Sequence, residues 1–211
     1  MYSNEKHLPW LALLGLILSL QACDSPKADG IPAKTSRKTA VTPPAIRILP
    51  LGHAPKALVD RTAEDLRKVF PDVRILPAEP MPVNAWYKTN KRWRADTLIG
   101  WMGKRAAPGE VYLGITTDDI SAAKEGVAQD FGIMGLGQKP GLACVASNHR
   151  LHDKSQFPKI VIHELGHTAG LPHCPEPRCL MRSANGKDHT REIDAFCDKC
   201  RSVLIRNGWR I

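Results

Sequence analysis

The sequence predicts one folded domain in which helices pack on a β-sheet, of the α/β or α+β class. Its 211 residues, of which 43% are hydrophobic, are enough to bury a core without disulfide support. Short segments with the alternating pattern of a strand are separated by longer segments whose apolar residues repeat every three or four positions. Strands that alternate with helices in this way favour a sheet domain.

The elements follow one another without an internal repeat. A helix is predicted for residues 55–70, which place apolar side chains on one face and charges off it. A second helix is predicted for 91–105, with Trp93 and Leu98 turned inward. The glycines and proline between residues 135 and 141 predict a loop. Strands are predicted for residues 46–50, 73–76, 111–115 and 142–146.

The first 22 residues have the form of a signal peptide. Their apolar run from Leu8 to Leu20 is shorter than the about 20 residues that span a bilayer, and it fits a signal-peptide core. The end of this segment, Leu20-Gln-Ala-Cys23, resembles the lipobox of bacterial lipoproteins. That resemblance implies cleavage after Ala22 and acylation of Cys23, which would anchor the chain in a membrane. The alternative is ordinary secretion, with Cys23 incidental.

Residues 23–45 are predicted to comprise the acylated Cys23 and the flexible tether that follows it. They contain four prolines and show no apolar periodicity, and as a flexible chain they would reach about 25–30 Å. The folded domain is then 46–211. We expect the protein in the bacterial cell envelope, lipid-anchored and facing the periplasm or the exterior.

The net charge of +9 indicates acidic partners. Aromatic and basic residues mix between positions 86 and 94, as they do on some nucleic-acid surfaces, but no nucleic-acid-binding motif is present. Attraction to anionic lipid headgroups beside the anchor accounts for the charge more simply. We therefore expect a monomer at a membrane, without a nucleic-acid partner.

The stretch from His163 to His173 reads HELGHTAGLPH, the H-E-x-x-H-x-x-G-x-x-H signature of metzincin-type zinc peptidases. Four residues of an α-helix advance about 400°, so His163 and His167 project from one face and can share a metal. Glu164 can reach a water on that metal without binding it. Gly170 can end the helix in the left-handed conformation, and the chain then brings His173 in as third ligand. Three protein ligands leave one position open, as in a catalytic zinc site.

Two cysteine pairs follow the histidines, Cys174 with Cys179 and Cys197 with Cys200. Pairs at short spacings are the usual format of a closed tetrahedral zinc site. Disulfides are the competing interpretation in an oxidising compartment, and a redox pair at Cys197 and Cys200 is a third. The remaining cysteine, Cys144, is expected as a buried strand residue, with a regulatory thiol that masks the zinc as the alternative.

Together these motifs resemble those of the archaemetzincins, a metzincin-clan family of zinc peptidases. The resemblance rests on HELGHTAGLPHC, on Cys179-Leu-Met181 and on the later Cys-x-x-Cys, with weaker similarity at 114–119, 131–137 and 143–151. It implies an α+β fold with a twisted mixed sheet over the active-site helix and a small C-terminal zinc-binding subdomain. It also implies that Met181 lies beneath the histidines as the Met-turn residue, packing without binding the metal. The ligands that it implies for the second zinc are Cys174, Cys179, Cys197 and Cys200.

The predicted function is hydrolysis of peptide bonds by a chain that holds two zinc ions, one catalytic and one structural. Glu164 is the predicted general base for a water activated at the three histidines. A peptide or protein substrate is expected to lie antiparallel along a sheet edge formed by 141–147, by analogy with other metzincins. The rival function is a lipid-anchored zinc-binding module without turnover. Glu164 argues against it, because a site that only binds zinc does not need that residue.

Overall fold

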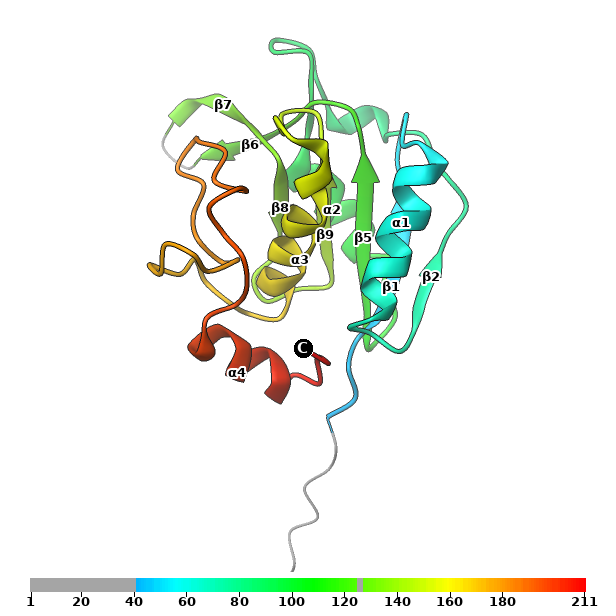
Figure 1. Cartoon of the computed structure of the whole chain (residues 1–211). Coiled ribbons are helices and arrows are strands. Elements are labelled where there is room, and N and C mark those ends of the chain that lie inside the picture. The colour runs from blue at the N-terminus through cyan, green and yellow to red at the C-terminus, as the bar shows by residue number, and fades with distance from the viewer. Residues whose placement is uncertain (1–40, 125–126) are drawn as a thin grey trace, which may run out of the picture. The chain divides into compact units, whose positions relative to one another are not determined.

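The structure, a computed structural model, describes residues 41–124 and 127–211. The predicted signal segment 1–22, Cys23 and most of the tether lie outside the described residues. The described part has two mixed sheets with helices packed on them, so the predicted α+β class is confirmed (Figure 1). Within that part, no helix is both long and apolar enough to cross a bilayer.

All strands of the described residues lie between residues 45 and 147, and two α-helices follow them. The strands are β1 Ala45–Pro50, β2 Val73–Ile75, β3 Trp86–Tyr87, β4 Arg92–Arg94, β5 Glu110–Thr116, β6 Ile120–Lys124, β7 Val127–Ile133, β8 Gly135–Gly137 and β9 Ala143–Ser147. The α-helices are α1 Lys56–Arg67, α2 Ala95–Gly103, α3 Phe157–Thr168 and α4 Asp198–Arg206, with short 3-10 turns at Val83–Ala85 and Lys154–Gln156.

The larger sheet has the strand order β2-β1-β5-β9-β8 and supports the helix that carries the histidines. Its first four strands are parallel, and β8 is antiparallel to β9. Side chains alternate between its faces: Cys144 and Ala146 pack with α1 and α3, whereas Ala143 and Val145 pack with α2. Helices α1 and α3 therefore cover one face and α2 the other (Figure 1).

The four predicted strands and the helix at 55–70 are present with shifted ends. The prediction of a helix over 91–105 is wrong in its first part, because residues 92–94 form β4 and the helix begins at Ala95. Tertiary pairing explains the difference, since β4 pairs with β3 and β6 and its Trp93 ring lies 4.9 Å from that of Trp86. The predicted loop at 135–141 is also wrong at its start, where Gly135–Gly137 forms β8.

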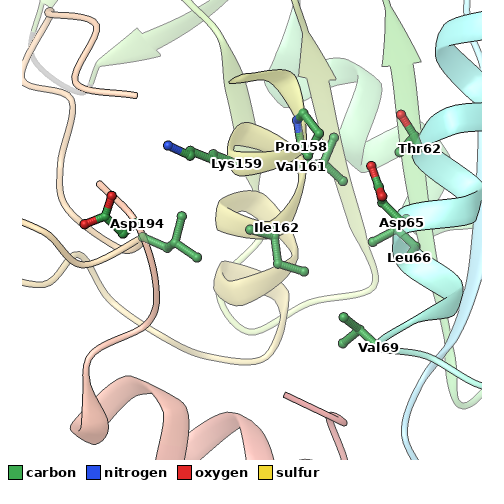
Figure 2. A pocket seen from close by; sticks show the side chains of 10 residues that line it. Thr62, Asp65, Leu66, Val69, Pro158, Lys159, Val161, Ile162 and Asp194 are labelled. Carbon is green, nitrogen blue, oxygen red and sulfur yellow. The ribbon is translucent and has the colours of Figure 1, made fainter. Parts of the chain in front are cut away.

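A pocket of about 210 Å³ lies between α1, α3 and the C-terminal segment (Figure 2). Its walls are mostly apolar, with Leu66 on α1 and Val161 and Ile162 on α3. Lys159 and Asp194 lie beside it. None of the motif histidines lines this pocket, so it is distinct from the site that the histidines form.

Candidate metal centres and active site

Helix α3 carries the first two histidines, and its ends are defined by local sequence. Pro158 lies in the first turn, where a missing N–H costs no helical hydrogen bond. At the other end Gly170 adopts a φ of 91°, and its N–H donates to the His167 carbonyl at 2.8 Å. The Leu171 N–H donates to the Gly166 carbonyl at 3.1 Å, which closes the reversed turn. The predicted end of the helix at Gly170 is thus observed.

The two helical histidines are oriented by backbone carbonyls. His163 Nδ1 lies 2.6 Å from the Leu180 carbonyl oxygen, and His167 Nδ1 lies 2.7 Å from that of Leu171. A neutral imidazole that donates from Nδ1 keeps its lone pair on Nε2, where a metal can bind. The two Nε2 atoms lie 3.1 Å apart. Two nitrogens on one tetrahedral zinc, each at about 2.0–2.1 Å, lie about 3.3 Å from each other, so this pair fits zinc.

The structure brings His173 to the same point from outside the helix. One ligand atom from each of the three histidines lies within 4.8 Å of the others, and the His173 ring centroid is 4.8 Å from that of His167. Burial lowers the pKa of all three imidazoles, that of His163 to about 4, and the charge of Lys139 also lowers the pKa of His167 and His173. Neutral imidazoles are the form that binds zinc, so the donor set fits the metal at neutral pH.

Glu164 is buried beneath β8, next to His163 on α3. Burial raises the pKa of its carboxyl to about 8, while the Gly137 N–H, which donates to the carboxylate, acts in the opposite direction. The strand approaches this closely because it carries glycine: a Cβ on Gly135 would lie 2.5 Å from Glu164 Oε1. A Cβ on Gly137 would overlap the Glu164 carbonyl oxygen.

The prediction that 141–147 forms the exposed sheet edge is wrong. Strand β9 is paired on both sides, with β5 and with β8, so it offers no free backbone groups along an edge. In the described part of the chain the outer strand on that side is β8, directly above Glu164. A three-residue Gly-Leu-Gly strand has no pattern that distinguishes it from a turn, which is why the sequence pointed to its neighbour.

Met181 lies under α3 and is fully buried. A Cβ on Gly166 would lie 2.6 Å from Met181 Sδ, so the thioether packs against the one residue of this helical turn that has no side chain. The Met181 carbonyl accepts a hydrogen bond from the Cys174 N–H at 2.8 Å. This bond connects the segment beneath α3 to the residue that follows His173. This is the position expected of a methionine that supports the site by packing.

The four C-terminal cysteines form a second group. One ligand atom from each lies within 4.8 Å of the others, and Cys174 Sγ is 3.7 Å from Cys197 Sγ. Sulfurs on one tetrahedral zinc, at about 2.3 Å each, lie about 3.8 Å apart, whereas a disulfide bond is only about 2.05 Å long. All four thiols are free. The Cys179 sulfur accepts backbone N–H groups from Met181 and Cys197, both at 3.4 Å.

Cys197 caps the start of α4, where the backbone N–H of Cys200 lowers the pKa of its thiol. Burial raises the pKa of the thiols of Cys174 and Cys200. Cys144 belongs to neither ligand group, and it is fully buried in β9 with a pKa well above its usual value. That environment is the one expected of a small core residue.

One structural contact near the sites had no signal in the sequence. Lys159 Nζ on α3 donates to the carbonyls of Thr190 and Ile193, both at 2.8 Å, and so fastens the C-terminal segment to the active-site helix. The partners are more than thirty residues away and are backbone atoms, so no pattern of side chains could have indicated them.

The chain is similar to known proteins over most of its length. Residues 125–206 match Peptidase family M54. The archaemetzincin of Haloarcula marismortui is 31% identical over 182 residues, which cover 75% of this chain and 99% of the relative. The archaemetzincin of Archaeoglobus fulgidus is 30% identical over 154 residues, covering 69% of this chain and 90% of the relative.

Two solved structures share the fold. The archaemetzincin of Archaeoglobus fulgidus, complexed with malonate, superposes with a TM-score of 0.63 at 27% identity and covers 75% of this chain and 99% of its own. The archaemetzincin of Methanopyrus kandleri superposes with a TM-score of 0.63 at 26% identity and covers 78% of this chain and 95% of its own. The relative from Haloarcula marismortui is similar enough over nearly its whole length to show the family. The chain therefore belongs to the archaemetzincins and is a zinc-dependent metallopeptidase.

Proposed function

We propose that this protein hydrolyses peptide bonds with one zinc on His163, His167 and His173 and with Glu164 as general base. The observation that carries the proposal is the convergence of the three imidazoles beside a buried carboxylate that is not one of the ligands. Zinc in such a site lowers the pKa of a bound water from about 16 to about 7 and polarises the scissile carbonyl.

The chain supplies the proton transfers. Glu164 accepts a proton from the attacking water and returns it to the leaving amine. Burial raises the proton affinity of this carboxyl, and the Gly137 N–H, which donates to it, favours the ionised form that must accept the first proton. The carbonyls of Leu171 and Leu180 keep the imidazoles in the tautomer that presents Nε2 to the metal.

Strand β8 would align the substrate. As the outer strand, it has backbone N–H and C=O groups on its unpaired side that can bind an extended peptide, apart from the Gly137 N–H that donates to Glu164. We place the peptide antiparallel to β8. Main-chain pairing of this kind accepts many sequences and fixes the scissile bond above Glu164. The substrate is therefore a peptide or an extended segment of a protein, bound by a monomeric enzyme.

We infer a second, structural zinc on Cys174, Cys179, Cys197 and Cys200, which gives two zinc ions per chain. The spacing of the sulfurs and the N–H groups that point at Cys179 support this assignment. Metal analysis of reduced protein should find two zinc ions per chain. One zinc ion together with no titratable thiols among the four cysteines would instead indicate disulfides.

We further propose that residues 1–22 are a signal peptide, that Cys23 is acylated and that 24–45 tether the enzyme in the cell envelope. About a quarter of this chain lies outside the match to relatives that are themselves covered almost completely, which supports an added segment. The mature protein should begin at Cys23 and partition into detergent, and Cys23→Ser should remove the acyl groups. Mass spectrometry that finds an unmodified N-terminus elsewhere would contradict the anchor.

The test of the enzymatic function is cleavage of an unbiased peptide mixture by zinc-loaded protein, with Glu164→Gln as the control. General-base catalysis is typically worth about 10²–10⁴-fold, so the variant should lose at least a hundredfold in turnover and keep its zinc. His167→Ala should lose metal and activity together. Equal cleavage by wild type and Glu164→Gln would reject the mechanism and leave a zinc-binding module without turnover.

A further inference from the structure

We propose that Lys139 selects substrates with an Asp or Glu side chain among the residues just before the scissile bond. The inference rests on the proposed peptidase function and names the substrate class that the same site prefers. Lys139 lies two residues after the end of β8, in the exposed connection to β9.

The backbone around Lys139 is fixed against the end of the active-site helix. The Gly141 N–H donates to the Thr168 carbonyl at 3.1 Å, and the Gln138 N–H donates to the Ala143 carbonyl at 3.1 Å. Pro140 Cβ lies 3.9 Å from the position that a Cβ on Gly170 would occupy. The backbone at Lys139 is therefore held next to the end of the helix that carries His167.

The direction of the lysine follows from the strand before it. Side chains added at Gly135 and Gly137 would point into α3, towards Glu164 and His167. With the same alternation, the side chain of Lys139 lies on the α3 side.

Lys139 is available to a ligand. It is exposed, and among the residues that the structure describes it forms neither an ion pair nor a side-chain hydrogen bond. An ammonium group at the rim of a binding site contributes little to folding and is suited to recognise a carboxylate.

The position along the substrate follows from the strand direction. Glu164 lies under Gly135, and His167 lies under Gly137, so the reaction is placed over the middle of β8. A peptide antiparallel to β8 then passes Lys139 with its residues on the amino-terminal side of the scissile bond. An acidic side chain there meets the ammonium group, whereas a Lys or Arg is repelled.

The test measures binding separately from turnover. Zinc-loaded Glu164→Gln protein is titrated with fluorescent peptides that differ only in carrying Glu, Gln or Lys at each position around the cleavage site. We expect Glu to bind about tenfold more tightly than Lys at one of the three positions before the scissile bond, with a preference that weakens in high salt. The preference should be absent at positions after that bond.

Variants then assign the preference to one side chain. When added to Glu164→Gln, Lys139→Met should abolish the preference for Glu over Lys peptides, and Lys139→Glu should reverse it. Lys104→Glu should leave the preference unchanged, because that exposed lysine follows α2 on the opposite face of the sheet. In active protein, Lys139→Met should raise KM for the Glu peptide with kcat unchanged.

Equal affinities for the Glu and Lys peptides, including a failure to bind either, would overturn the inference, as would a preference that survives Lys139→Glu. The outcome is distinct from that of the peptidase proposal. Without hydrolysis by the wild type there is no scissile bond to define positions, so a preference for Glu peptides that Lys139→Glu reverses would reject the peptidase and leave a selective cleft.

Discussion

His173 and Cys174 are consecutive residues that belong to different ligand groups. The imidazole of His173 joins the histidines, and the buried thiol of Cys174 lies 3.7 Å from that of Cys197. The N–H of Cys174 is bound to the Met181 carbonyl beneath the active-site helix. Any change at the cysteine group that moves the backbone at residue 174 therefore displaces a ligand of the other group.

This connection predicts that Cys174→Ser weakens both metal sites. The second zinc that we propose should be lost because a thiolate ligand is replaced. The affinity of the histidine site for zinc should fall by about 10–100-fold, as it does when residues that orient a ligand are removed. The measurement is chelator competition with metal analysis for each site.

Cys200→Ser is the matched control, since it removes a ligand of the same group at a position on α4 that is remote in sequence from His173. It should release the second zinc with a smaller effect on the first. If both variants lower the zinc affinity of the histidine site equally, the two metal sites are not coupled through the peptide bond between residues 173 and 174.

Gly135→Ala should lower activity through a steric conflict with the Glu164 carboxylate, the proposed general base. The added Cβ would lie 2.5 Å from Glu164 Oε1, so either β8 or Glu164 must move, and displacement of a general base by about 1 Å can cost about 100-fold in rate. Peptide hydrolysis and zinc content of the same preparation separate this effect from loss of metal.

Gly100→Ala is the control for that substitution. Gly100 lies on α2 with no atom within 4 Å of an added Cβ, so alanine there should raise the free energy of unfolding by about 0.5–1 kcal/mol and leave hydrolysis unchanged. Full activity of Gly135→Ala would show that β8 is not held against Glu164 as described.

Met181→Leu tests whether the methionine acts by packing alone. Leucine conserves volume and fills the space below Gly166, so we expect a loss of less than about 1.5 kcal/mol in unfolding free energy, with zinc retained. Met181→Ala should cost about 2–5 kcal/mol, because it leaves a cavity under the helix. Denaturant unfolding and metal analysis give both quantities. Loss of the catalytic zinc from the leucine variant would assign the thioether a direct role in binding.

The sequence predicts the parts of this site whose geometry is local. The pair His163 and His167 follows from the pitch of a helix, and Gly170 follows from the conformation that a helix end needs. The carbonyl of Leu180 and the strand that covers Glu164 come from segments remote in the chain, so no spacing encodes them. The same limit explains β4, where pairing with β6 overrides a helical pattern.

Lys159→Met should loosen the C-terminal segment without touching either ligand group. The lysine donates to two backbone carbonyls, Thr190 and Ile193, and hydrogen bonds from a charged donor contribute about 1.5–3 kcal/mol each when buried. Because this side chain is only half-buried, we expect a total loss of about 2–3 kcal/mol in the free energy of unfolding, together with faster proteolysis around residues 188–194.

Lys104→Met serves as the control for loss of a surface lysine and should change the free energy of unfolding by less than about 0.5 kcal/mol. Urea unfolding and limited proteolysis of zinc-loaded protein measure both effects. Equal stability of the two variants would show that the connection between α3 and the C-terminal segment depends on the apolar contacts and the metal alone.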